Sequence, residues 1–234
     1  MLVEEAAYDD SIIPLPDHLS YDKAVLTEPF SVAMHGINIA DPKPGQKVVI
    51  YGAGIIGLCA VAVLKSKGIN DIMINDLVPK RLKVAEELGA VAFNSKDGGY
   101  VEFIKKQWGT ATDSMGNETI NADIVLDIAG YKGVLTEYLA NAKSGSALSV
   151  IALGSVPEEV VPYVLVAKDI RILGSRGYTA DDIKESIAAL SKEETYIDPI
   201  ITNEFPLSEI VEAFEVASDK ENEIKVVVNH EALK

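Results

Sequence analysis

Apolar residues along this chain form short continuous runs that alternate with longer stretches of helical spacing. The short runs predict buried strands at Val48–Tyr51, Asp71–Asn75, Val91–Asn94, Asp123–Ile128, Ala147–Leu153 and Ile170–Leu173. Helical stretches lie between them, and Pro79–Leu88 shows the usual helix signals, with proline in its first turn and Gly89 past its end. Strands separated by such helices indicate βαβ units. The predicted fold class is α/β, a doubly wound six-stranded parallel sheet of Rossmann type.

Both ends of the chain depart from this alternation. Two prolines in Ile12–Asp17 oppose a helix there, and a helix is expected over Lys23–Ile39, broken locally by Pro29. Beyond residue 178 the pattern predicts the helices Ala180–Leu190 and Leu207–Ala217 and the strand Ile224–Asn229. We therefore expect three units, which are residues 1–40, a Rossmann domain over residues 41–178, and a C-terminal segment over residues 179–234.

The first predicted strand runs directly into a glycine-rich turn. Gly52, Gly54 and Gly57 have the spacing G-x-G-x-x-G. In this motif the first glycine permits a tight turn, the second lets a pyrophosphate approach the backbone, and the third lets helix and strand pack closely. The helix opens at Ile55 and Ile56, where free N–H groups and the helix dipole favour phosphate. The stretch predicts a dinucleotide-binding turn.

An acidic residue ends the second strand, at the distance from the glycines that a dinucleotide site requires. The carboxylate of Asp76 is expected to accept hydrogen bonds from both adenosine ribose hydroxyls, and its charge repels a 2′-phosphate, so that NAD is favoured over NADP. Arg81 is expected to lie on or near the adenosine. The alternatives are that Asp76 is a helix N-cap or loop aspartate and that Arg81 is a solvated charge on a helix. S-adenosylmethionine or a flavin also suits such a fold, but the glycine spacing and Asp76 favour a nicotinamide cofactor.

Ligands in this architecture lie at the carboxyl ends of the strands. Three turns are therefore further candidates for the cofactor site, and their residues are Ala129, Gly130, Ile151, Ala152, Leu153, Arg176, Gly177 and Tyr178. Small residues in these turns let the backbone line a flat adenine or nicotinamide ring. The alternative is that they are ordinary βα turns, which also favour glycine.

Composition excludes several classes of protein. The 234 residues include 21 Lys and Arg against 36 Asp and Glu, and the net charge of −15 opposes nucleic-acid binding. No apolar run reaches the roughly 20 residues of a membrane span, and the acidic N-terminus lacks the basic region of a secretion signal. A single cysteine, Cys59, excludes an internal disulfide and a cysteine-based zinc cluster. We expect a cytoplasmic protein with no nucleic-acid or membrane partner.

Four stretches of the chain resemble the zinc-type medium-chain dehydrogenases. They are Ile12–Leu26, Thr27–Ile37 with the sequence TEPFSVAMHGI, Ile74–Ala90, which contains Asp76 and Arg81, and Phe205–Val228. The likeness is closest to the sorbitol, butanediol and threonine dehydrogenase branch. The resemblance implies the C-terminal part of such an enzyme, in which both ends of the chain are remnants of a GroES-like domain.

The resemblance also implies an activity. Enzymes of this family oxidise an alcohol or polyol by hydride transfer to NAD⁺, with a zinc ion that polarises the substrate oxygen. Glu28 occupies the glutamate position of the family's E-P-x-S-V motif, which implies a place at or near that zinc. Read without the family, Glu28 is a solvent-facing helix carboxylate.

The zinc ligands that the family carries upstream have no counterpart in this sequence. A catalytic zinc needs about three protein ligands, and His18, His35 and His230 do not supply them, because His35 is expected to pack and the others flank a turn and the C-terminus. We expect this chain alone to bind no zinc. Two functions stay open: the cofactor-binding portion of an NAD-dependent zinc-type alcohol or polyol dehydrogenase, or a non-catalytic NAD-binding module or partner subunit.

The predicted strand Ile170–Leu173 lies at an edge of the sheet. Exposed edges invite pairing with another chain, and the family resembled here commonly joins two such domains across this edge. We therefore expect a homodimer.

Overall fold

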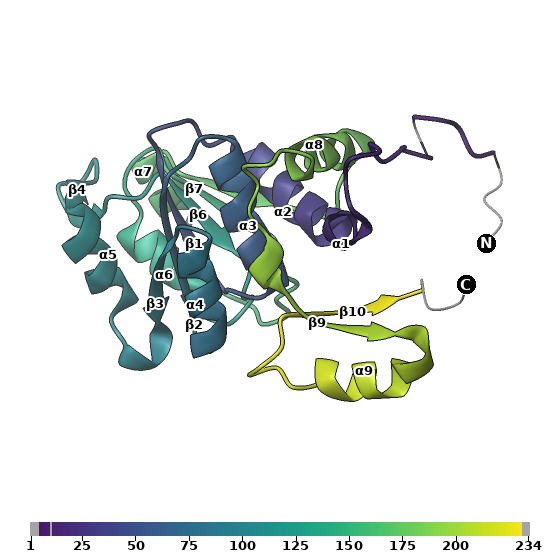
Figure 1. Ribbon diagram of the computed structural model, residues 1–234. Helices are drawn as coiled ribbons and strands as arrows, with labels where there is room; N and C mark the ends of the chain where they lie inside the picture. Colours follow the sequence, from purple (N-terminus) through teal and green to yellow (C-terminus); the bar gives the residue numbers. More distant parts are fainter. Residues whose placement is uncertain (1–4, 10, 231–234) are drawn as a thin grey trace.

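The computed structural model describes residues 5–9 and 11–230, and its centre is a six-stranded sheet in the order β3-β2-β1-β6-β7-β8 (Figure 1). The strands are β1 (Lys47–Tyr51), β2 (Asp71–Asp76), β3 (Val91–Asn94), β6 (Ile124–Asp127), β7 (Ala147–Val150) and β8 (Arg171–Gly174). Each neighbouring pair is parallel. The inner strands are apolar on both faces because helices cover both sides. The predicted doubly wound fold is confirmed, and β7 ends three residues earlier than predicted, at Val150.

The strand order reverses between β1 and β6. The chain adds β2 and β3 on one side of β1 and then crosses over to add β6, β7 and β8 on the other side. Tyr51, the last residue of β1, is paired with Asn75 on one side and with Asp127 on the other. An open parallel sheet forms its ligand crevice beyond the carboxyl ends of the strands at such a reversal. The glycine-rich turn after β1 lies at this place.

Helices form one layer on each face of the sheet. One layer contains α2 (Thr27–Ala40), α3 (Ile55–Ser66), α4 (Pro79–Glu87) and α8 (Ala180–Leu190), and the other contains α5 (Tyr100–Trp108), α6 (Val134–Asn141) and α7 (Pro162–Lys168). Each layer has its own cluster of buried apolar side chains. The sheet therefore separates two cores.

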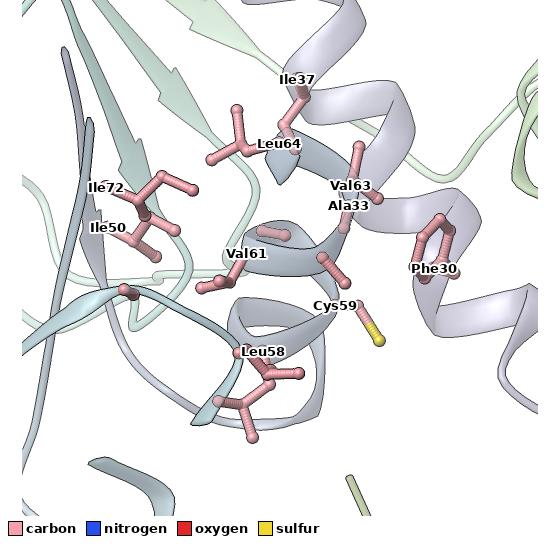
Figure 2. Close-up of a cluster of buried hydrophobic side chains, with 14 of the residues drawn as sticks. Phe30, Ala33, Ile37, Ile50, Leu58, Cys59, Val61, Val63, Leu64 and Ile72 are labelled. Atoms are coloured by element: carbon pink, nitrogen blue, oxygen red, sulfur yellow. The ribbon is translucent and has the colours of Figure 1, made fainter. Parts of the chain in front are cut away.

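Helix α3 is the most deeply buried helix of the first layer. Every residue from Gly57 to Leu64 is buried, which explains why its sequence is apolar on all sides. Figure 2 shows Phe30, Ala33 and Ile37 of α2 on one side of α3 and Ile50 and Ile72 of the strands on the other. Burial raises the pKa of the Cys59 thiol to about 12, so that this free thiol is an inert core residue.

Pro29 does not interrupt a helix, contrary to the sequence prediction. It is the third residue of α2, where a backbone N–H has no acceptor within the helix in any case. The break lies earlier, between a short helix α1 (Tyr21–Ala24), which Ser20 caps, and the start of α2 at Thr27.

A small C-terminal lobe stands apart from the six-stranded sheet (Figure 1). It consists of β9 (Ile201–Pro206), α9 (Ile210–Ala217) and β10 (Lys225–Asn229), and its two strands pair in parallel. Strand β9 was not predicted, because its sequence ITNEFP is polar at three positions and ends in proline. Its partner β10 is distant in sequence, and pairing with β10 makes it a strand.

The remaining elements are short. They are the hairpin β4 (Thr110–Thr112) and β5 (Glu118–Ile120) and the 3₁₀ turns η1 (Ser95–Asp97), η2 (Asp198–Ile200) and η3 (Leu207–Glu209). Among the described residues, no helix is both long and apolar enough to cross a membrane.

Asp182, in the first turn of α8, joins α8 to α2. Its carboxylate accepts hydrogen bonds from the N–H and hydroxyl of Thr179 and from Asn38, and it lies 2.9 Å from His35 Nδ1. Thr179 and Asp182 together form a capping box at the start of α8. Burial raises the pKa of Asp182, but the hydrogen bonds from Thr179, Asn38 and His35 lower it more, and the result lies below the usual value.

Replacing this carboxylate is expected to weaken the fold in a pH-dependent way. Because the pKa of Asp182 is lowered by folding, its stabilisation is present above the unfolded-state pKa near 3.8 and is lost as the pH falls through the folded-state pKa. Asp182→Asn should lower the free energy of unfolding by about 2 kcal/mol at pH 7 and by less at pH 3, measured by urea titration. Asp181→Asn, at the exposed neighbouring position, is the control. Equal losses for the two variants at pH 7 would contradict this account.

Candidate functional site

The turn after β1 is held at Gly52 in a conformation that only glycine adopts easily. Gly52 has φ of +100°, and a Cβ atom there would lie 3.2 Å from the backbone and Cβ of Ala129. Its N–H donates to the carbonyl of Asn75 at 2.9 Å and is 3.3 Å from the side-chain oxygen of Asn75. The turn after β1 therefore touches the end of β2 on one side and the turn after β6 on the other.

The other two glycines of the motif have different roles. A Cβ atom at Gly57 would lie 2.0 Å from the carbonyl oxygen of Gly52, so that glycine is required for α3 to approach the turn. A Cβ atom at Gly54 would meet nothing within 4 Å. Gly54 is the N-cap of α3 with extended backbone, and packing within the described chain does not explain a glycine there. A glycine that borders open space at a helix N-terminus fits the close approach of a phosphate.

Asp76 is fixed by backbone N–H groups from two turns. Its Oδ2 accepts from Ala53 at 2.8 Å, and its Oδ1 accepts from Leu77 at 2.7 Å and from Val78 at 3.0 Å. The alternative of a loop aspartate is therefore partly realised, because Asp76 shapes the start of α4. Each carboxylate oxygen accepts more than one hydrogen bond, so that the held side chain also suits the two adjacent hydroxyls of a ribose.

Arg81 is not a solvated helix charge. Its Nη1 lies 3.9 Å from Asp76 Oδ2, its Nη2 donates to the carbonyl of Lys220 at 2.8 Å, and its side chain is only 22% exposed. Its Nε is buried and has no hydrogen-bond partner among the described residues. The guanidinium thus lies beside the carboxylate that was predicted to hold the adenosine ribose.

Asp127, the last residue of β6, anchors the turn that follows this strand. Asp127 Oδ1 accepts from the N–H of Ala129 at 3.2 Å and of Gly130 at 2.9 Å. Burial raises the pKa of Asp127 above its usual value, against the lowering effect of these two N–H groups. Gly130 has φ of +66°, and a Cβ atom at Gly154 would lie 3.2 Å from the carbonyl oxygen of Gly130. The turns after β6 and β7 are therefore packed backbone against backbone.

Four turns form one continuous rim at the carboxyl edge of the sheet. Asp76 bonds Ala53, Gly52 lies against Ala129, and Gly130 lies against the turn that holds Ala152 and Gly154. Residues 151–153 of this rim differ in burial, since the side chain of Ile151 is buried and Leu153 is 98% exposed. Most of the predicted cofactor residues thus share one edge, which no short-range sequence pattern guarantees.

The remaining predicted residues lie away from the turn of the glycine motif. Arg176, Gly177 and Tyr178 follow β8, are exposed, and lead into α8. Glu28 is exposed in the first turn of α2. His18 and His230 are exposed as well, and His35 is paired with Asp182. Across residues 5–9 and 11–230, no three His, Cys, Asp or Glu side chains come together as a metal site, so the described donors do not fit a catalytic zinc.

Sequence reasoning missed three residues that shape the rim. Asn75 and Asp127 are buried polar residues at the ends of β2 and β6, and Lys220 supplies a carbonyl from far along the chain. A polar residue that ends an apolar strand directly before a turn is a signal for the first two. The pairing of Arg81 with Lys220 has no such signal, because it joins residues 139 positions apart.

Comparison with known proteins adds relatives of this chain. The sequence profile of a family described as "Zinc-binding dehydrogenase" matches residues 56–192. Sorbitol dehydrogenase of Bacillus subtilis (strain 168) is 32% identical over 222 residues, covering 94% of this chain and 60% of that protein. D-xylulose reductase of Saccharomyces cerevisiae is 29% identical over 224 residues, covering 94% of this chain and 61% of that protein. The chain thus spans about 60% of the length of these curated relatives.

A solved structure agrees with these sequence matches. A protein of E. coli CFT073, described as a short chain alcohol dehydrogenase and complexed with the cofactor NADH, superposes with a TM-score of 0.82 at 25% identity. The match covers 93% of this chain and 62% of that one. The likeness therefore extends over the six-stranded sheet and the C-terminal lobe together.

The two glycines Gly54 and Gly57 are expected to respond differently to alanine. Gly57→Ala should lower the free energy of unfolding by about 3 kcal/mol or more, because its Cβ would overlap the carbonyl of Gly52. Gly54→Ala should cost at most about 1 kcal/mol yet weaken NADH binding about 10-fold or more. Urea titration and NADH fluorescence check both variants. Two variants of equal stability, or a Gly54→Ala protein that binds NADH normally, would overturn these roles.

Proposed function

Because the chain belongs to the zinc-binding dehydrogenase family, we propose that its rim binds a nicotinamide dinucleotide as the cofactor portion of an alcohol or polyol dehydrogenase. The family resemblance read from the sequence is confirmed by this match. The proposal rests on one observation above all, the open space at Gly54 at the start of α3. Packing demands glycine at Gly52 and Gly57, whereas at Gly54 a bound pyrophosphate would explain it.

The chain's own residues would divide the work of binding along the rim. The N–H groups at Ile55 and Ile56 would hold the pyrophosphate, and Asp76 would accept the hydroxyls of the adenosine ribose. The turns at Gly130 and Ala152 would support the nicotinamide half, as would Arg176 and its neighbours after β8. In this role the protein orients the cofactor, which supplies the hydride chemistry when bound.

We propose NAD rather than NADP as the preferred dinucleotide. The carboxylate of Asp76 is held in place by three backbone N–H groups and cannot turn away from a 2′-phosphate without losing them. A fixed negative charge at this position repels that phosphate. Arg81 lies beside Asp76, and its Nη1 forms an ion pair with this carboxylate at 3.9 Å.

The longer relatives are named as dehydrogenases or reductases of sugars and polyols. The described residues of this chain hold no donor set for zinc. Glu28 alone would be a weak metal neighbour. This observation favours a second candidate function for the chain by itself, a dinucleotide-binding module without chemistry. Turnover of a secondary alcohol or diol with NAD⁺ and added Zn²⁺ distinguishes the two candidates. An alcohol or polyol remains the proposed substrate of the whole enzyme.

We also propose a cytoplasmic location, which the single cysteine supports.

We propose the division at residues 40 and 178 for the chain's relation to another domain, while α2 and α8 themselves pack in the helical layer on the sheet. Residues 41–178 contain the sheet and the rim, and residues 179–234 contain α8 and the C-terminal lobe. Exposed apolar side chains on the lobe, such as Val211 and Phe214 of α9, and Tyr8 and Tyr21 before residue 41 support a role for these ends in packing against another domain.

We also propose a homodimer through β8. Among the strands of the described residues, β8 pairs with β7 alone, so that its outer edge is open there. The segment before it carries five exposed apolar side chains, which are Leu153, Val156, Val161, Tyr163 and Val166. An open edge bordered by apolar residues suits pairing with a second copy.

Removing the carboxylate at the rim tests the cofactor proposal. Asp76→Ala should raise the Kd for NADH about 10-fold or more through lost hydrogen bonds to a charged acceptor. NADPH should be affected less, since the repulsion of its 2′-phosphate is also removed. Asp71→Ala, at the exposed opposite end of β2, is the control. Identical titrations of wild type and Asp76→Ala with both dinucleotides would refute the assignment.

Charge on the flank of β8 tests the dimer. Val166→Asp, at a position that is 82% exposed, should convert a dimer into a monomer in light scattering, because the buried charge would have no partner in the interface. Val211→Asp on α9, at a similarly exposed apolar position, should leave the mass unchanged. A monomeric wild type, or a Val166→Asp variant that is still a dimer, argues against this interface.

A further inference from the structure

Two basic side chains of α4 bind the turn between α9 and β10. Arg81 Nη2 donates to the carbonyl of Lys220 at 2.8 Å, and Lys80 Nζ donates to the carbonyl of Asn222. Figure 1 shows this turn on the side of the C-terminal lobe that faces α4 and β2. The adenosine end of the rim is therefore in direct contact with a lobe whose strands do not join the main sheet.

The turn that receives these bonds has its own internal support. Asp219 Oδ1 accepts from the N–H groups of Glu221 and Asn222, each at 3.1 Å, and its Oδ2 accepts from the side-chain amide of Asn222 at 2.8 Å. The carbonyls of Lys220 and Asn222 are thus presented to α4 in a fixed geometry. Asp219 makes none of its hydrogen bonds to α4 itself.

The guanidinium of Arg81 presents one donor group, Nη1, on the side of Asp76. It is planar and rigid, so the bond from Nη2 to Lys220 sets the directions of Nη1 and Nε. Nη1 lies 3.9 Å from Asp76 Oδ2, and Nε is buried without a partner among the described residues. A ligand seated on Asp76 can take the donor Nη1 while Nη2 keeps its bond to Lys220, whereas the buried Nε–H projects on the side of Nη2.

We propose that Arg81 is a positioning residue that couples the adenosine half of the dinucleotide site to the C-terminal lobe. The inference rests on the proposed function and adds a regulation to it. Ligand at Asp76 and the docked turn hold the same guanidinium from two sides, so each stabilises the other. Such coupling is reciprocal: the docked turn raises the affinity for the ligand, and the ligand steadies the lobe.

This coupling differs from simple packing of the lobe on α4. A purely structural contact would protect the lobe equally with and without ligand, and loosening the turn would leave the affinity of the rim unchanged. The coupling requires both quantities to change together. Substitutions in the turn therefore distinguish the two cases, because the turn itself holds no residue of the proposed cofactor site.

The first measurement is the affinity for ADP-ribose, which carries only the adenosine and pyrophosphate part of the dinucleotide. Asp219→Ala should raise the Kd from isothermal titration by roughly 3- to 10-fold, the effect of one lost hydrogen bond on Arg81. Arg81→Lys should do so at least as strongly, because lysine lacks the planar fork. Glu221→Ala is the control, since only its backbone N–H binds Asp219. Circular dichroism confirms that each variant is folded.

The second measurement is hydrogen exchange of the lobe, residues 201–229, in the full chain. ADP-ribose should slow exchange there in the wild type and in Glu221→Ala, and should have little effect on the lobe in Arg81→Lys. Either of two results would overturn the coupling. One is a wild type that binds ADP-ribose with no change in the hydrogen exchange of the lobe, and the other is an Asp219→Ala protein that binds ADP-ribose with wild-type affinity.

The outcomes also separate this inference from the function on which it rests. If the wild type does not bind ADP-ribose, the proposed cofactor site fails and the coupling fails with it. If the wild type binds and Asp76→Ala does not, while Asp219→Ala and Arg81→Lys bind normally, the site stands and only the coupling is rejected.

Discussion

The close contact between α3 and the turn that precedes it is the constraint on which the candidate site depends. A Cβ atom at Gly57 would lie 2.0 Å from the carbonyl of Gly52, so the helix reaches the turn only with glycine at this position. This contact sets where α3 begins and aims its free N–H groups beyond the edge of the sheet. Because every residue from Gly57 to Leu64 is buried, the position of the helix is also fixed by the core.

Short carboxylates then hold the surrounding backbone. Asp76 binds the N–H groups of the turns after β1 and β2, and Asp127 binds those of the turn after β6. Asp182 does the same at the start of α8, where it also ties α8 to α2. Aspartate suits these places because its short side chain reaches nearby N–H groups and so satisfies turns and helix starts. One consequence is that Asp76 has a structural role as well as its proposed role toward the ribose.

The sheet and most of the rim were predictable from sequence because local patterns carry them. The short apolar runs Val48–Tyr51 and Ile72–Ile74 indicate β1 and β2, and the glycine spacing with Asp76 places the turns. The strand β9 was not predictable in this way, since its polar residues become a strand only by pairing with β10. Pro29 was misread because its effect depends on its position in the helix, at the third residue, rather than on its presence. The contact of Arg81 with Lys220 depends on the docking of the lobe, which only the folded chain reveals.

A crystal structure of the protein grown with NADH tests the central claim most directly. The account predicts density for the pyrophosphate against the backbone of Gly54 at the start of α3, and for a ribose within hydrogen-bond distance of Asp76. It also predicts that Arg81 keeps its bond to the carbonyl of Lys220. NADH bound elsewhere, or an empty rim in crystals saturated with the dinucleotide, would contradict the account.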